Sequence, residues 1–293
     1  MGSDVVIILA GNPGSGKSTL LNSLAGRIIF QSGVSFGEGM TTVVQTARGR
    51  DGIIYGDTPG LDDIARRAKA ADEIKKILRA NNAIKLCIVI TLEAGRIKPA
   101  DIATMEVILD ALPASTTNMF SIIINKVDKS VAEQFKNSEN LERLLLGLNS
   151  AKHRTSHIHF VLKEDIHDGE DDAMLSNIES LRNTLDAMPI LRYISSEVKD
   201  IKHDAFEKNR EQFAADLEQV KKANKEQLNE MARRHDEALA SARVETEKER
   251  HRFLQQMNQM NAEHQLALAA LNERWAAVNR APAFEGMLAR ISF

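Results

Sequence analysis

"GNPGSGKST", residues 11–19, follows the apolar run Val5–Ala10 and precedes a helix-like segment. It matches the pattern G-x-x-x-x-G-K-[ST], in which backbone N–H groups line a phosphate nest at a helix N-terminus. Gly11, Gly14 and Gly16 let the backbone curl close to a phosphate. The alternative is a chance glycine turn, which the eight matching positions between strand and helix disfavour. We therefore predict a phosphate-binding loop.

The side chains at the end of this loop predict how a nucleotide would be held. Lys17 can reach the β- and γ-phosphates, and the Ser18 hydroxyl can bind magnesium. The predicted nucleotide contacts in this stretch are Gly11, Asn12, Pro13, Gly14, Ser15, Gly16, Lys17, Ser18 and Thr19.

The chain up to about residue 190 alternates short apolar runs with helix-like segments. Several runs are nearly continuous in apolar residues, as expected when helices cover both faces of a parallel sheet. This alternation predicts an α/β fold with a doubly wound, mostly parallel sheet, and ligands at the carboxyl ends of its strands. The expected strands are Val5–Ala10, Thr42–Ala47, Ile53–Tyr55, Ile84–Ile90, Ser121–Ile124 and Ile158–Leu162, and helices are expected after Lys17, Leu61, Pro99, Lys129 and Asp172.

A second motif, "GDTPG" at residues 56–60, follows the run Ile53–Tyr55. After a phosphate loop, Asp57 can hold magnesium through a water, and the N–H of Gly60 can reach the γ-phosphate. A threonine between the two motifs should cap the magnesium, and we expect Thr41, with Thr42 as the alternative. The predicted metal set is therefore Ser18, Thr41 and Asp57, and the predicted catalytic set includes Lys17, Thr41 and Gly60.

A third motif, "NKVD" at residues 125–128, ends the apolar run that starts at Ser121. Asp128 can accept hydrogen bonds from N1–H and the 2-amino group of guanine, and adenine offers neither donor. A buried Asp128 would be left unpaired against adenine, and a site built on buried hydrogen bonds rejects a base that lacks the matching donors by several orders of magnitude. Asn125 is expected to join this loop to the phosphate loop, and the stem of Lys126 to cover the purine face. The ligands predicted are GTP and GDP with Mg²⁺.

The last loop that contacts the base is expected after the strand Ile158–Leu162, near Lys163 or Glu164.

The remainder of the chain has a different character. No Gly lies between Gly169 and Gly286, and no Pro between Pro189 and Pro282. The sequence predicts a GTPase domain over residues 1–193 and a helical, partly coiled-coil extension over 194–293. The weak span Val244–Arg250 is either solvated helix or a reversal, and imperfect heptads favour a fold-back or a discontinuous coiled coil. The apolar stripe comprises Phe206, Phe213, Leu217, Val220, Leu228, Met231, Phe253, Met257, Met260, Ala267, Leu271, Trp275 and Val278.

Composition narrows the function classes. The 293 residues carry a formal net charge of -3, which gives no general reason to expect nucleic acid as a partner. The chain has one cysteine, and no stretch reaches the roughly 18 apolar residues of a membrane span. We expect a cytoplasmic protein without a transmembrane segment.

The motifs resemble the translation-factor-related class of P-loop GTPases. Within that class, "GNPGSGKSTLLNSLAG", "DTPGL" and the segment at residues 91–112 resemble the immunity-associated nucleotide-binding family, which includes the avirulence-induced proteins. The resemblance covers about residues 4–190 and implies tight GTP binding, slow hydrolysis and dimers across the nucleotide face. "NKVD" departs from that family's variable base motif, so a septin-, dynamin- or Era-like GTPase stays open.

Turnover is expected to need a partner. Leu61 follows Gly60, where a Gln could orient the attacking water. Arg96 matches the Gly-Arg of the family's box and is the candidate for a charge supplied in trans, with Arg48, Arg66 and Arg67 as rivals. Three classes remain: a switch activated by self-association, a nucleotide-gated scaffold whose output is the helical tail, and an RNA-bound Era-like GTPase. The even mixture of Glu and Lys in the tail counts against the third class.

Overall fold

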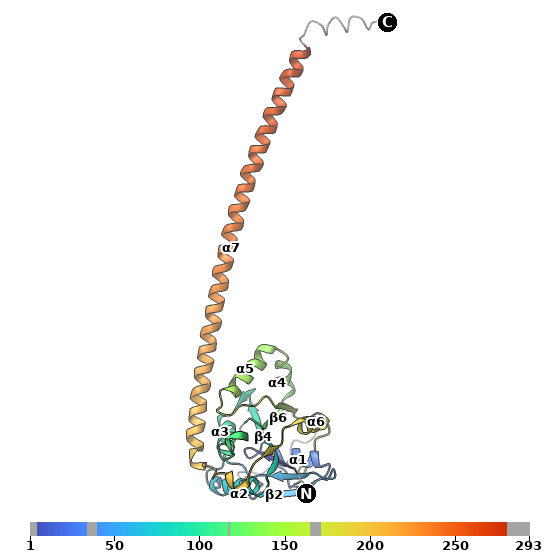
Figure 1. Ribbon diagram of the computed structural model, residues 1–293. Helices are drawn as coiled ribbons and strands as arrows, with labels where there is room; N and C mark the ends of the chain where they lie inside the picture. The colour runs from blue at the N-terminus through green and yellow to red at the C-terminus, as the bar shows by residue number, and fades with distance from the viewer. Residues whose placement is uncertain (1–4, 34–39, 117, 165–170, 280–293) are drawn as a thin grey trace, which may run out of the picture. The chain divides into compact units, whose positions relative to one another are not determined.

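The computed structural model describes residues 5–33, 40–116, 118–164 and 171–279 (Figure 1). At its centre is a sheet with the strand order β2-β3-β1-β4-β6-β7, and β5 and β8 also pair with β4. In chain order the elements are β1 (Val6–Ala10), α1 (Lys17–Ala25), β2 (Gln45–Arg48), β3 (Ile54–Asp57), α2 (Arg67–Ala80), β4 (Ala83–Glu93), β5 (Arg96–Ile97), α3 (Pro99–Leu109), β6 (Ser121–Val127), α4 (Lys129–Gln134), α5 (Ser138–Asn149), β7 (Ile158–Leu162), α6 (Glu179–Ala187), β8 (Leu191–Arg192) and α7 (Phe206–Asn279).

Helices cover both faces of this sheet. The strand pairs β1–β3, β1–β4, β4–β6 and β6–β7 are parallel, and β2 is antiparallel to β3. Val6, Ile8 and Ala10 of β1 pack into a core with residues of α2, α3 and α5. Ile7 and Leu9 pack into a second core with residues of α1 and α6. Because successive strand residues point to opposite faces, the apolar run fills both cores. The predicted doubly wound α/β fold is confirmed.

The second strand, β2, is shifted from its predicted position. It was expected at Thr42–Ala47, whereas β2 is Gln45–Arg48. The Thr41 hydroxyl donates to Asp57 at 2.9 Å, and the Val44 N–H donates to the Glu73 carboxylate at 3.2 Å. Because side chains bond this segment to other parts of the domain, the backbone ladder with β3 begins only at Gln45.

Two predicted helices also differ in extent. The helix expected directly after Asp172 begins at Glu179, because the Glu164 carboxylate accepts from the backbone N–H groups of Ser176 and Asn177 and holds a loop there. The segment after Lys129 forms two helices, and Asn137 caps the second of them. Strands β5 and β8 have two residues each, too few for a periodic pattern in the sequence.

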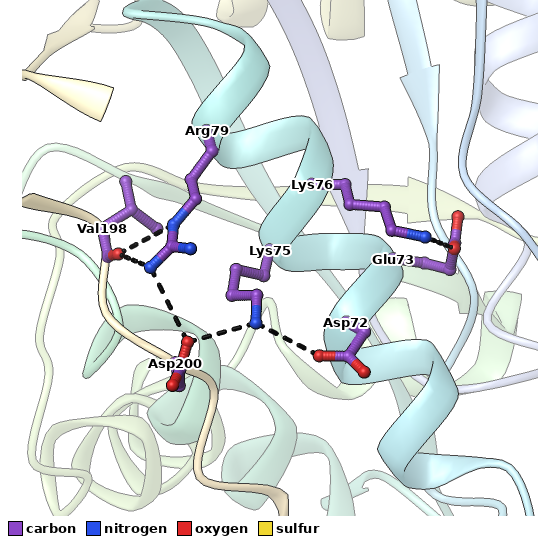
Figure 2. Close-up of polar contacts among 7 residues, drawn as sticks. All are labelled: Asp72, Glu73, Lys75, Lys76, Arg79, Val198 and Asp200. Atoms are coloured by element: carbon purple, nitrogen blue, oxygen red, sulfur yellow. Dashed lines mark hydrogen bonds and ion pairs between the residues drawn. The ribbon is translucent and has the colours of Figure 1, made fainter. Parts of the chain in front are cut away.

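The chain after β8 returns to α2 (Figure 2). Arg79 donates to the carbonyl oxygen of Val198 at 2.7 Å, and Asp200 accepts from Lys75 at 3.1 Å. Short 3₁₀ turns at Ser195–Glu197 and His203–Ala205 precede α7. The long helix therefore begins at Phe206, about a dozen residues later than the predicted extension.

Helix α7 has 74 residues. Phe206 and Phe213 in its first turns are buried in the domain's core, and Leu217 packs against it. The chain divides into two compact units, Met1–Lys222 and Ala223–Phe293. Among the described residues, no helix has the length and apolar character that crossing a membrane requires.

The reversal at residues 244–250, one of the two alternatives for this span, is not found, because α7 runs from Phe206 to Asn279 without a break. Residues 244–250 are helical and exposed, which is the solvated alternative for this span. They contain neither Gly nor Pro, and Lys248 and Glu245 form an ion pair at the helical spacing of three residues. Because nothing in this stretch breaks a helix, α7 continues through it.

Candidate nucleotide-binding site

The phosphate loop lies between β1 and α1, as predicted. Gly16 precedes α1 in the left-handed conformation, with φ 88°. A Cβ at Gly11 would lie 2.2 Å from the carbonyl oxygen of Val89 on β4, so only glycine fits there. The Lys17 amine is folded onto the loop and donates to the carbonyl oxygens of Gly11 and Asn12 at 3.0 and 3.1 Å.

Lys17 is buried together with acidic partners. Burial lowers the pKa of its amine, while the charges of Asp57 and Asp101 oppose that change. A phosphate group would supply further negative charge beside the amine and would replace the two carbonyl contacts.

The predicted metal residues meet at the end of β3. The hydroxyls of Ser18 and Thr41 both donate to Asp57 Oδ2, at 2.7 and 2.9 Å. Asp57 is 1% exposed, and its Oδ1 is buried with no hydrogen-bond partner in the part of the chain that the structure describes. Burial raises the pKa of Asp57, and the Lys17 charge and the two hydroxyls act in the opposite direction. A buried acceptor without a donor, beside two hydroxyls, fits a hard cation with oxygen ligands such as Mg²⁺.

Gly60 lies directly against the phosphate loop. A Cβ on it would come within 2.2 Å of Pro13 Cδ, so the close approach of the two loops requires glycine. Beside this contact is a pocket of about 200 Å³, lined by Pro13, Thr41, Thr42, Pro59, Gly60, Asp63, Arg66, Lys69 and Ala70. Both candidate threonines line it, but Thr41 is the one bonded to Asp57.

A buried network behind the loop was not predicted from the sequence. The Asn12 side chain makes two of these bonds. Its Nδ2 donates to Asp101 Oδ1 at 2.7 Å, and its Oδ1 accepts from the Thr104 hydroxyl at 2.5 Å. Asp101 Oδ2 accepts from the N–H of Thr91 at 3.1 Å. Asp101 and Thr104 lie on α3, so this helix is bonded to the phosphate loop through the side chain of Asn12. A polar pair three residues apart in an apolar helix was the only signal in the sequence.

The "NKVD" residues lie beside the phosphate loop at the end of β6. Asn125 Nδ2 donates to the Ser15 carbonyl at 2.8 Å, as predicted for the residue that joins the two loops. Lys126, with φ 57°, donates to the carbonyl oxygen of Gly14 at 3.0 Å. Asp128, predicted to be buried, is exposed at the N-cap of α4, where a base could reach it.

The loop after β7 starts beside this motif. The N–H of Lys163 donates to the carbonyl oxygen of Val127 at 2.9 Å, which places Lys163 next to the "NKVD" stretch. Glu164 accepts from Ser176 and Asn177 instead. Residues 165–170 lie outside the described residues, so the structure does not place the rest of this loop.

The four candidate arginines occupy different environments. Arg96 is exposed in β5, at the end of a hairpin whose turn contains Ala94 and Gly95 with positive φ. Arg67 is buried: it donates to the Leu61 carbonyl at 2.7 Å, pairs with Glu207 at 3.0 Å and lies 3.9 Å over the Phe206 ring. Arg67 therefore has a structural role inside its own domain.

The other two rivals also have contacts within the domain. Arg48 donates to the carbonyl oxygen of Gly52, and Arg66 lies near Asp63 at 4.0 Å on the wall of the pocket beside Gly60.

Comparison with known families agrees with this geometry. The family model described as 50S ribosome-binding GTPase matches residues 6–126, which contain the phosphate loop, "GDTPG" and the start of "NKVD". The chain carries a P-loop GTPase domain. No curated protein matches the chain.

Several solved structures are similar to this chain at low sequence identity. NFeoB from S. thermophilus, bound to GDP·AlF4⁻ and K⁺, is 14% identical over 67% of this chain and 65% of its own, with a TM-score of 0.38. Aquifex aeolicus Era is 21% identical over 63% and 56%, with a TM-score of 0.38. Toc33 from Arabidopsis thaliana, in complex with GDP and Mg²⁺, is 15% identical over 65% and 88%, with a TM-score of 0.42. The first two matches thus span less than two thirds of those proteins. The narrower resemblance to the immunity-associated family stays a prediction.

Proposed function

We propose that the protein binds GTP and GDP with Mg²⁺ and hydrolyses GTP slowly, as a switch whose turnover rises on self-association. The observation that carries this proposal is the convergence of Ser18 and Thr41 on Asp57, whose second carboxylate oxygen is buried and has no donor among the described residues. When bound, Mg²⁺ would neutralise phosphate charge at this corner of the site. Ser18, Thr41 and Asp57 are the residues that would hold it.

The protein's own groups account for phosphate binding and for base selection. The loop N–H groups and the Lys17 amine bind phosphate oxygens, and the N–H of Gly60 lies where the loop after β3 meets the phosphate loop. The exposed carboxylate of Asp128 selects guanine through two hydrogen bonds. Lys163 borders the same region and is the proposed contact from the last loop.

Slow intrinsic turnover follows from what lies after Gly60. Leu61 is fully buried and cannot orient a water molecule. The exposed Arg96, beyond the carboxyl end of β4, is available to a second copy of the domain, whereas Arg67 is occupied by Leu61, Phe206 and Glu207. We propose Arg96 as the group that stabilises transition-state charge in trans.

A kinetic experiment tests this function. The hydrolysis rate per protein molecule should rise across two decades of protein concentration, and Arg96→Ala should remove only the concentration-dependent part. Arg48→Ala is the matched exposed control and should leave that part unchanged. A rate that is flat with concentration would refute activation by self-association.

A scaffold with negligible hydrolysis is the second candidate, favoured by the buried Leu61. Single-turnover measurements separate the two, because a scaffold would retain bound GTP at every protein concentration. Analysis of the nucleotide that co-purifies with the protein tests guanine binding independently of turnover.

A further inference from the structure

The second unit of the chain exposes a large amount of apolar surface. Nine side chains of α7 are between 41% and 67% exposed and lie on one face of the helix: Leu228, Met231, Leu239, Phe253, Met257, Met260, Leu268, Leu271 and Trp275. With 3.6 residues per turn, they fall within an arc of about 100°. We name these nine residues the α7 stripe. An exposed apolar patch of this extent marks an interaction site.

The stripe repeats every eleven residues. Leu228 and Leu239 are one repeat apart, as are Met257 with Leu268 and Met260 with Leu271. Met231, Phe253 and Trp275 are each two repeats apart. When His264 is counted as a position of the same face, the steps from residue 253 to 275 are four, three, four, four, three and four. An eleven-residue period corresponds to 3.67 residues per turn, whereas a heptad corresponds to 3.5.

This period explains why the heptad pattern is imperfect. In a heptad frame, the residues that interrupt the apolar positions are Asn224, Arg234, His235, Thr246 and His264, and of these Arg234 lies off the face of the α7 stripe. In the eleven-residue frame, Asn224, His235 and Thr246 belong to the series that continues through Met257 and Leu268, and His264 lies midway between Phe253 and Trp275. The other four residues are therefore positions of the same face, and polar positions within such a seam restrict which register two helices adopt.

We infer that the α7 stripe binds the stripe of a second copy of this chain, in a coiled coil with an eleven-residue repeat. A helix with an ordinary heptad repeat would diverge from this face along its length, since a heptad seam winds in the opposite sense. A second copy has the matching period by definition. The pairing needs no nucleotide and is distinct from the proposed contact across the nucleotide face.

Charge and area agree with this partner. Residues 223–279 carry eight Lys or Arg and nine Asp or Glu, so two copies do not repel through net charge. A strongly acidic or basic partner finds no complementary surface there. At about 25 cal/mol per Å², the 1.5–3 kcal/mol of a buried apolar side chain corresponds to roughly 60–120 Å², so nine of them would bury roughly 500–1,100 Å² per chain, a range that includes the roughly 800 Å² per partner of a standard interface.

The test compares exposed apolar residues on and off the stripe in the full chain. Met260→Glu and Leu271→Glu place a charge on the stripe. Val244→Glu and Leu266→Glu make the same chemical change at positions that are 54% and 72% exposed but lie on the opposite side of α7. Sedimentation velocity in GDP and Mg²⁺, from about 1 to 50 μM, measures the dissociation constant, and circular dichroism checks that α7 remains helical.

We expect a wild-type dimer, a dissociation constant raised at least tenfold by either stripe variant, and a change below twofold in the off-stripe variants. A monomeric wild type over this range would overturn the inference, as would equal effects of the two pairs of variants. Dimers that form only with GTP and ignore the stripe would also overturn it, while leaving the proposed GTPase function intact. Conversely, failure to hydrolyse GTP would not alter the masses measured in GDP.

Discussion

Asn125 Nδ2 donates to the carbonyl oxygen of Ser15 at 2.8 Å, across 110 residues of sequence. Asn125 is 5% exposed and Ser15 is 2% exposed, so the bond is shielded from water. It joins the loop proposed to select the base to the loop proposed to bind phosphate. Disturbing either loop should therefore affect binding at the other.

Replacing Asn125 by Ala leaves the Ser15 carbonyl buried without this donor. An unsatisfied buried group costs about 1–3 kcal/mol. We therefore expect the free energy of unfolding to fall by about 1–3 kcal/mol and the affinity for GDP to fall at least tenfold. Lys126→Ala is the matched control for stability, because its bond to Gly14 lies at an exposed side chain. Equal losses of unfolding free energy for the two variants in denaturant titrations would contradict the role of the buried bond.

Asp128→Asn should move the base preference from guanine towards xanthine, because one carboxylate acceptor becomes a donor. Competition between GDP and xanthosine diphosphate measures the ratio of affinities, which we expect to change by a factor of 100 or more. Because the side chain of Asp128 is exposed, the substitution should leave the fold unchanged. An unchanged ratio would show that Asp128 does not contact the base.

The two threonines before β2 should differ in their effect on magnesium. Thr41 donates to Asp57, whereas Thr42 has no such bond among the described contacts. Thr41→Ala should raise the Mg²⁺ concentration needed for tight GTP binding at least tenfold, and Thr42→Ala should change it less than threefold. Chelation of Mg²⁺ should speed GDP release from the wild type, as measured by stopped flow. The reverse order of the two variants would make Thr42 the metal residue.

Lys17→Ala should abolish tight binding of both GTP and GDP, since its amine supplies the phosphate charge. Ser18→Asn should weaken binding mainly in the presence of Mg²⁺. Wild-type GTP affinity in Lys17→Ala, measured by titration, would remove the phosphate-loop assignment.

The network behind the phosphate loop permits a test by exchange. Asp101→Asn keeps the shape but offers one acceptor to two donors, the Asn12 amide and the Thr91 N–H. We expect a loss of about 1–3 kcal/mol in unfolding free energy and faster GDP release.

In the double variant Asn12→Asp with Asp101→Asn, every donor again meets an acceptor. Thermal stability should recover in the double variant. A further loss would show that stability depends on the position of the negative charge rather than on the number of hydrogen bonds.

Cys87 should be inert in the folded protein. It is fully buried, and burial raises the pKa of its thiol from the ordinary 9.0 to about 12. Because the unfolded thiol ionises first as pH rises, the stability linked to this group is present below pH 9 and is lost between about 9 and 12. Alkylation at pH 8 should be at least 100-fold slower in the native protein than in denaturant, by mass spectrometry. Rapid native labelling would show that this part of the second core opens.

The local sequence was sufficient to predict where the motifs lie in the fold and which strands precede them. The phosphate loop, "GDTPG" and "NKVD" each follow an apolar run, and the carboxyl ends of parallel strands meet at one edge of a sheet. Ser18, Thr41 and Asp57 could therefore be predicted as neighbours before any distance was known. The sequence contains this information because each motif directly follows its strand, and the propensities that form strands, turns and helices act over a few residues.

Tertiary structure decided what depends on partners distant in sequence. The shift of β2 follows from the bonds of Thr41 and Val44 to side chains beyond it. The burial of Arg67 against Phe206 and Glu207 distinguishes a structural arginine from the exposed Arg96, although both look alike as charged residues in the sequence. The link from Asn12 to Asp101 spans 89 residues, and no local pattern encodes a hydrogen bond of that kind. Periodicity and motif spacing report on the chain's own neighbours, whereas burial and pairing are properties of the packed domain.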